Sequence, residues 1–164
     1  MKKMLVLAMT MAMVLLAAAG VCETLRVGME CNYAPYNWTQ SDASAYAVAN
    51  EAGGYADGYD VRIAKIIADK FGMELEIVNT EWDGLTPALL SGNIDVIIAG
   101  MSPTAERKMT IDFTDSYYDT ELTVVVRKDS AFASAKNLAD LAGAKITGQM
   151  STFHYDMIDQ IEGA

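Results

Sequence analysis

Hydroxyl groups and a cation follow an apolar run in the segment GMSPTAERKM, residues 100–109. Ser102 suits the N-cap of a helix and Pro103 its first position, so this pattern predicts a helix that begins there. Arg107 is not explained by capping, because a cation near a helix start opposes the helix dipole. An arginine beside N–H groups at a helix start can bind a carboxylate through two hydrogen bonds. We therefore predict an anion site around Ser102 and Arg107.

Acidic and aromatic side chains follow two other apolar runs. Glu30 and Tyr33 come after the first run, and Trp82 comes after the second. Two aromatic rings that face a cleft can hold a small ligand between them, and a carboxylate can pair with a cationic end of that ligand. Thr104 lies with Ser102 and Arg107 after the third run. The alternative is that the two rings are packing residues and that Arg107 is a solvated charge on a helix.

Three strands must position these residues. The apolar periodicity predicts strands at residues 25–29, 73–78 and 94–99 and helices at residues 60–71 and 83–91. Asp60 can cap the first helix and Gly72 can end it. The polar segment 37–58 predicts a loop or hairpin excursion. This order of elements favours a parallel sheet with helices on both faces, and ligands bind beyond the carboxyl ends of such strands.

The composition shifts after Phe113. A second unit is predicted as a strand at residues 122–127, a helix around residues 137–141, a strand at residues 144–147 and a helix from about Phe153. The sequence ends at Ala164, inside or just after that last helix. We therefore expect the second α/β unit to be incomplete.

Residues 1–19 predict a secretory leader. Lys2 and Lys3 precede an apolar stretch that ends in small residues, and this stretch is shorter than the roughly 20 residues of a membrane anchor. The protein is therefore expected to be exported to the periplasm, or to be extracellular and membrane-anchored if Cys22 carries a lipid. The alternative for Cys22 is a disulfide with Cys31.

The chain is acidic. It has 12 basic and 22 acidic residues, and removal of the two leader lysines changes the balance from −10 to 10 minus 22, or −12. Such a charge argues against binding to nucleic acid or to anionic lipid. The cysteines and His154 match no zinc spacing, so we predict no metal and no cofactor. His154, the only histidine, is expected to be an ordinary helix residue rather than part of a Ser-His-Asp site.

Four stretches of the sequence resemble a known family. LRVGMECNYAPYNW, GYDVRIAKIIADKFG, EWDGLTPALLSGNIDVIIAGMSPTAERKMTIDFTDSYY and LADLAGAKITGQMSTF are similar, in this order, to the polar amino-acid-binding proteins of bacterial ABC importers. The resemblance runs from Leu25 to the end of the chain. It implies an α/β fold of the periplasmic-binding-protein type II, with a first lobe at residues 20–116, a hinge at residues 117–121 and an incomplete second lobe at residues 122–164.

The resemblance also implies roles for individual residues. Arg107 and the Ser102 N–H group would hold the α-carboxylate of an amino acid, and the Gly100 carbonyl and Ser102 hydroxyl its ammonium group. Tyr33 and Trp82 would enclose the side chain. Glu30 would contact a polar or cationic end of that side chain. Thr152 and the backbone of Phe153 would complete the site for the α-carboxylate. Ser151 and Phe153 depart from the family's glycine- and threonine-rich pattern, which weakens the contribution of the second lobe.

The implied function is non-catalytic. A monomeric receptor would capture a free polar or cationic amino acid and deliver it to an ABC permease in the membrane. Two alternatives remain open. One is an enzyme on the same scaffold, resembling cyclohexadienyl or arogenate dehydratases, in which Glu30 would be the acid or base. The other is an extracellular sensory domain.

Overall fold

The computed structural model describes residues 23–50 and 53–164. The predicted leader and Cys22 lie outside these residues, and with them the expectations about export, lipidation and the Cys22–Cys31 disulfide. Cys31 itself is buried and its thiol is free. Within the described residues, none of the helices has the length and apolar character needed to span a bilayer.

A parallel sheet forms the centre of the N-terminal part. Strand β1 (Thr24–Met29) lies between β6 (Glu74–Asn79) and β7 (Val96–Ile97). This confirms the predicted parallel arrangement. The third strand, β7, is shorter than the predicted residues 94–99. Just before it, the Arg26 N–H group donates to the Asp95 carboxylate, 2.8 Å away, and so is not used in the ladder.

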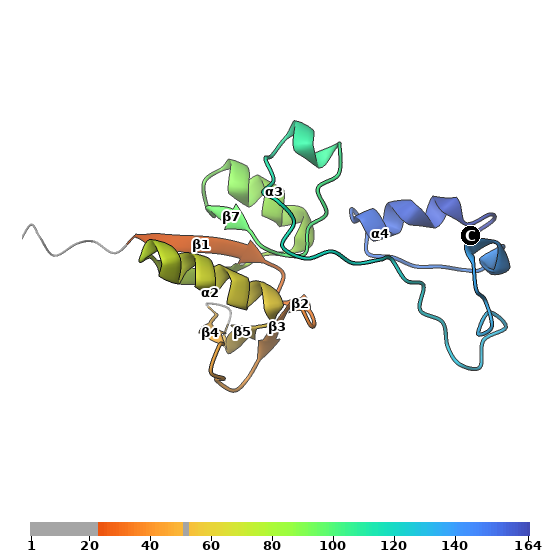
Figure 1. Ribbon diagram of the computed structural model, residues 1–164, viewed down its shortest axis with the longest axis horizontal. Helices are drawn as coiled ribbons and strands as arrows, with labels where there is room; N and C mark the ends of the chain where they lie inside the picture. The colour runs from red at the N-terminus through yellow and green to blue at the C-terminus, as the bar shows by residue number, and fades with distance from the viewer. Residues whose placement is uncertain (1–22, 51–52) are drawn as a thin grey trace, which may run out of the picture.

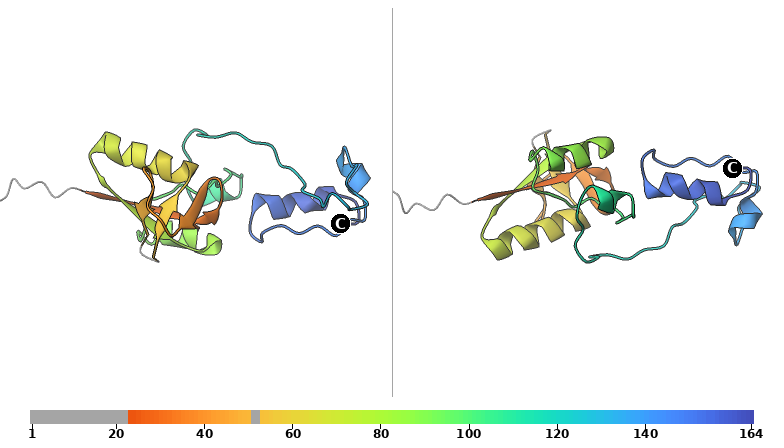
Figure 2. Two further views of the ribbon diagram at one scale, coloured as in Figure 1. Left: turned by 90° about the horizontal axis from the view of Figure 1, so that it is seen from below. Right: turned by 90° about the horizontal axis from the view of Figure 1, so that it is seen from above.

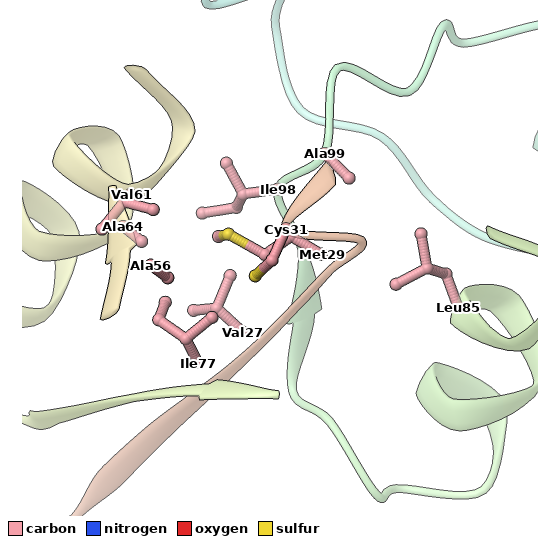
Figure 3. Close-up of a cluster of buried hydrophobic side chains, with 10 residues drawn as sticks. All are labelled: Val27, Met29, Cys31, Ala56, Val61, Ala64, Ile77, Leu85, Ile98 and Ala99. Carbon is pink, nitrogen blue, oxygen red and sulfur yellow. The ribbon is translucent and has the colours of Figure 1, made fainter. Parts of the chain in front are cut away.

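Two helices cover opposite faces of this sheet (Figure 2). They are α2 (Tyr59–Phe71) and α3 (Trp82–Leu90). Val27 and Met29 are fully buried on the face toward α2, and Leu85 of α3 lies on the other side of β1 (Figure 3). Gly28 faces α3, where a Cβ atom would lie 3.1 Å from Cδ2 of Leu85 and would also clash with Ile94. Successive residues of β1 point to opposite faces of the sheet, so Val27 and Met29 pack toward α2 while Gly28 lies against α3.

The polar segment before α2 forms a small antiparallel sheet. Its strands are β2 (Asn32–Tyr33), β3 (Asn37–Gln40), β4 (Val48–Ala49) and β5 (Tyr55–Asp57), in the spatial order β2-β3-β5-β4. The predicted excursion is therefore a set of hairpins.

Gly58 leads from this small sheet into α2. Its φ of 131° lies in the region that favours glycine, and a Cβ atom at this position would clash with the Tyr36 carbonyl oxygen. Gly58 is also the N-cap of α2, without a side-chain capping bond. The predicted capping role of Asp60 is wrong, because its fully buried carboxylate bonds to Asn37 and Tyr117 instead.

No helix begins at Ser102, which corrects the sequence-based prediction. The first helical turn after β7 is the 3-10 helix η1 (Arg107–Met109). The Thr104 hydroxyl accepts a hydrogen bond from the Arg107 N–H group at 3.3 Å, and the Thr104 carbonyl accepts one from the Lys108 N–H group at 3.0 Å. The turn thus starts at Thr104, and Arg107 meets no opposing dipole of a long helix.

The C-terminal part is built from short turns of helix. These are η2 (Leu138–Leu141), which the Asn137 side chain caps, α4 (Phe153–Asp156) and η3 (Met157–Gln160). The predicted strands at residues 122–127 and 144–147 do not form, because no described segment supplies ladder hydrogen bonds to them. Figure 1 shows this part, with α4, beyond the carboxyl end of β1.

Candidate ligand-binding site

A cavity of about 400 Å³ lies at the carboxyl ends of the parallel strands. It is lined by all eight residues that the sequence suggested: Glu30, Tyr33, Trp82, Gly100, Ser102, Arg107, Thr152 and Phe153. They come from β2, from the segments after β1 and β7, from the start of α3, from η1 and from the start of α4. The parallel topology places the segments after β1 and β7 and the start of α3 at one edge of the sheet, whereas Thr152 and Phe153 are contributed by the C-terminal part. Thr104 lines a neighbouring cavity instead, behind Arg107.

Arg107 is half-buried at the floor of the cavity. Its Nη1 donates to the Ser102 carbonyl and its Nη2 to the Ser151 carbonyl, each at 3.0 Å. Burial lowers the pKa of its guanidinium, and the nearby Asp156 and Glu106 act in the opposite direction. Arginine keeps its charge in proteins, so the cavity contains a fixed cation with further N–H donors.

Trp82 lies beside this cation. The guanidinium carbon of Arg107 is 5.3 Å from the centre of the Trp82 ring, a cation–π distance. The indole N–H donates to the Ser151 carbonyl at 2.8 Å. One backbone oxygen of the C-terminal part therefore accepts hydrogen bonds from two side chains of the N-terminal part.

The backbone around Ser151 is held by its neighbours. Ser151 has a φ of 60°, in the left-handed region. The hydroxyl of Thr152 donates to the Gln149 carbonyl at 2.6 Å and accepts from the Tyr155 N–H group at 3.3 Å, so it caps α4. Because both partners of this hydroxyl are local, Thr152 has a structural role in addition to its place in the cavity wall.

Aromatic rings form another wall. The rings of Tyr33 and Tyr36 stack with centroids 5.0 Å apart, and Tyr118 meets Tyr36 edge-on at 5.4 Å. Tyr36 also lines the cavity, although the sequence reasoning missed it. Its position three residues after Tyr33 is the signal that could have found it.

Two carboxylates line the cavity together with the one arginine. Glu30 accepts a hydrogen bond from the Gln149 side chain at 2.8 Å, across 119 residues of sequence. Glu121, from the segment between the two parts, is the second acid. Gln149 and Glu121 were both missed, because no local pattern in the sequence indicates that they turn toward the site. His154 lies in α4 and also lines the cavity.

Curated relatives of this sequence bind amino acids. A probable histidine-binding protein of Campylobacter jejuni is 36% identical over 141 residues, which are 86% of this chain and 50% of the relative. An arginine-binding extracellular protein of Bacillus subtilis is 34% identical over 114 residues, 70% of this chain and 40% of the relative. The chain thus spans about half the length of the curated relatives it matches.

Solved structures of amino-acid-binding proteins are also similar to this chain. The arginine-bound form of truncated ArgBP from T. maritima is 38% identical with a TM-score of 0.70, over 85% of this chain and 60% of that one. Its arginine-bound domain 1 alone is 41% identical with a TM-score of 0.50, over 58% of this chain and 68% of that one. An ancestral amino acid-binding protein, a precursor of cyclohexadienyl dehydratase, is 34% identical with a TM-score of 0.68, over 84% of this chain and 56% of that one.

These similarities agree with the fold and with the order of the sequence motifs. The structural neighbours establish an α/β fold of the periplasmic-binding-protein type II. A sequence model of one family matches residues 25–161, which is most of the chain. The protein belongs to the bacterial extracellular solute-binding proteins, family 3.

Proposed function

We propose that this chain is the ligand-binding component of an amino-acid ABC importer and that its ligand is a cationic amino acid. The observation that carries the proposal is the charge inventory of the cavity: among the residues that the structure describes, two carboxylates, Glu30 and Glu121, and one arginine, Arg107, line it. A zwitterion with a cationic side chain has one negative and two positive groups. Each group of such a ligand then finds a partner of opposite charge.

The carboxylate of the ligand is assigned to Arg107. A guanidinium has five N–H donors, and the two described bonds leave others for a ligand. The bond to the Ser151 carbonyl is also exchangeable, because a carboxylate carries a full negative charge and can accept two parallel N–H bonds from a guanidinium, which a single carbonyl oxygen cannot. Ser102 lies beside Arg107 in the cavity wall and contributes its N–H group to the same carboxylate.

The side chain of the ligand is assigned to the aromatic walls. Trp82, Tyr33 and Tyr36 enclose the apolar stem, and a long stem ending in a guanidinium or ammonium group would reach the carboxylates. We assign the ligand's ammonium group to the Gly100 carbonyl and to one of the two acids. The arginine-binding relative and the arginine-bound structures support arginine as the first ligand to test.

The two parts of the chain are proposed to act as lobes. The first lobe, residues 20–116, and the second, residues 122–164, would close around the ligand about a hinge at residues 117–121. The receptor would act outside the cytoplasm and deliver the ligand to a permease in the membrane. Domain 1 of the T. maritima protein holds arginine by itself, which supports binding by a chain that covers mainly the first lobe. The monomeric state stays a prediction.

Isothermal titration calorimetry of the chain with the twenty amino acids tests the proposal. We expect arginine or lysine to bind most tightly, and Arg107→Ala to abolish binding. Lys108→Ala is the matched control, because Lys108 is the adjacent exposed cation and does not line the cavity. Absence of binding by every amino acid, or full affinity in Arg107→Ala, would contradict the proposal.

Dehydratase activity is the second candidate, because the ancestral neighbour is a dehydratase precursor and Glu30 lines the cavity. In this case Glu30 would move a proton on a cyclic acid whose carboxylate is held by Arg107. Incubation with prephenate or arogenate separates the two functions. Product formation that Glu30→Gln abolishes would favour the enzyme, and binding of arginine without turnover of either acid would favour the receptor.

A further inference from the structure

The hydroxyl of Tyr117 lies between the ligand cavity and a buried carboxylate. It donates a hydrogen bond to Oδ1 of Asp60 at 2.9 Å and accepts one from the Gly100 N–H group at 3.2 Å. Gly100 lines the cavity, and its φ of 61° is in the left-handed region that favours glycine. The direction of this peptide group is therefore set by a side chain that lies 17 residues further along the chain.

The same carboxylate also holds a second loop of the site. Oδ2 of Asp60 accepts a hydrogen bond from the Asn37 side chain at 2.8 Å, and Oδ1 of Asn37 accepts one from the Cys31 N–H group at 2.9 Å. Cys31 follows Glu30 directly. Asn37 and Asp60 are 1% and 0% exposed, so water does not compete for these bonds. The loops after β1 and β7 are thus joined through one buried group.

The direction of each bond follows from the donors present: a backbone N–H group can only donate, so the Tyr117 oxygen accepts from Gly100 and its own proton is left for Asp60. Burial raises the pKa of the Asp60 carboxyl, whereas the hydrogen bonds from Asn37 and Tyr117 lower it. Burial and the Asp60 charge raise the pKa of the Tyr117 hydroxyl, so this group keeps its proton at physiological pH. Tyr117 is therefore the donor toward Asp60, and its lone pair is left for the Gly100 N–H group.

We propose that Tyr117 is a positioning residue of the amino-acid site, whose hydroxyl, oriented by Asp60, fixes the Gly100 peptide and links it to the predicted hinge. This inference rests on the proposed function. Residue 117 begins the segment that crosses from one part of the chain to the other. A movement of this segment would therefore also move the hydrogen-bond acceptor of Gly100.

Tyr117→Phe tests the inference, because it removes the hydroxyl and keeps the ring that stacks on Tyr59 at 6.2 Å. The matched control is Tyr59→Phe, which removes the 3.2 Å bond from the Tyr59 hydroxyl to the Tyr117 carbonyl but leaves Gly100 untouched. We expect arginine affinity to fall about tenfold in Tyr117→Phe and less than about threefold in the control. Amide hydrogen exchange at Gly100 should become faster only in Tyr117→Phe.

A swap of two residues gives an independent test. Asp60→Asn alone leaves one acceptor oxygen where Asn37 and Tyr117 both donate, so one of these two hydrogen bonds is lost and binding should weaken. The double variant Asn37→Asp with Asp60→Asn restores a donor and an acceptor at that contact, and it still offers acceptors to Tyr117 and to the Cys31 N–H group. We expect this double variant to regain most of the affinity, which general damage to packing would not allow.

The outcomes separate the two proposals. If the wild-type chain binds no amino acid, the proposed function and this inference both fail. If the wild-type chain binds arginine and Tyr117→Phe binds it equally well, only the inference fails. Weaker binding by Tyr117→Phe with unchanged exchange at Gly100, or a double variant no better than Asp60→Asn, would also overturn it.

Discussion

The guanidinium of Arg107 donates a hydrogen bond to the backbone carbonyl of Ser151, 3.0 Å away and 44 residues further along the chain. The Trp82 indole donates to the same oxygen. This carbonyl can face both donors because Ser151 has a φ of 60°. The contact between the two parts of the chain thus depends on a backbone conformation and not on the serine side chain.

Ser151→Gly should stabilise the protein. An L-residue in the left-handed region costs about 1 kcal/mol relative to glycine, and the substitution removes this cost. Urea denaturation should therefore show a higher free energy of unfolding. Ser91→Gly is the control, because Ser91 has a φ of −83° at the end of α3 and glycine should lower stability there. An unchanged or lower stability of Ser151→Gly would contradict the prediction.

Glu121→Gln should weaken the binding of arginine about tenfold, because one charge-assisted hydrogen bond becomes a neutral one. Binding of citrulline, the neutral isostere of arginine, should change much less. Calorimetric titration with both ligands measures the difference. Glu81→Gln controls for net charge, because Glu81 is exposed and does not line the cavity. Equal losses for both ligands would remove Glu121 from the side-chain site.

Cys31 should resist thiol reagents in the folded protein. Burial raises the pKa of its thiol to about 11, so roughly one thousandth of it is ionised at pH 8, and only the thiolate reacts. In a Cys22→Ser background, Ellman's reagent should react slowly with the native protein and rapidly after unfolding in urea. Rapid reaction without denaturant would show that this part of the core opens readily.

The Arg26–Asp95 pair should make a pH-dependent contribution to stability. Two side-chain bonds, at 2.6 and 3.0 Å, and one backbone bond hold the carboxylate and lower its pKa below the ordinary value of 3.8. The folded state then favours the ionised form. The stabilisation is therefore present above about pH 4 and is lost as the pH falls through the lowered pKa.

A double-mutant cycle with Arg26→Ala and Asp95→Ala measures this coupling. The free energy of unfolding should show a favourable interaction at pH 7 that weakens as the pH falls below the ordinary carboxyl pKa of 3.8. The Arg127–Asp129 pair provides the comparison, because it joins residues of one exposed turn and links no two elements. A coupling that does not change with pH would contradict the assignment.

The parallel sheet could be predicted because its signals are local. Apolar runs, Gly72 after a helical pattern and short connections indicate strands and helices without knowledge of distant residues. The topology then brings the carboxyl ends of the strands to one edge, which is why Glu30, Trp82 and Arg107 could be placed together. Their roles in binding stay a prediction.

The sequence-based predictions fail where the structure of a residue depends on partners that are distant in the sequence. Asp60 looks like a helix cap in the sequence, but its carboxylate is bonded to Asn37 and to Tyr117, 23 and 57 residues away. Residues 122–127 have β-branched side chains, yet a strand needs a paired neighbour, and none of the described segments provides one. Ser102 resembles an N-cap, but the turn that leads into η1 starts at Thr104.

The central place of β1 in the sheet also affects how binding selectivity can evolve. Its backbone is hydrogen-bonded to β6 on one side and to β7 on the other, so the frame beneath the site is fixed. The residues that line the cavity lie outside β1, on β2, α3, η1, α4 and the connecting segments. Single substitutions at these positions can change the ligand preference without changing the sheet. One fold can therefore give rise to receptors for many solutes.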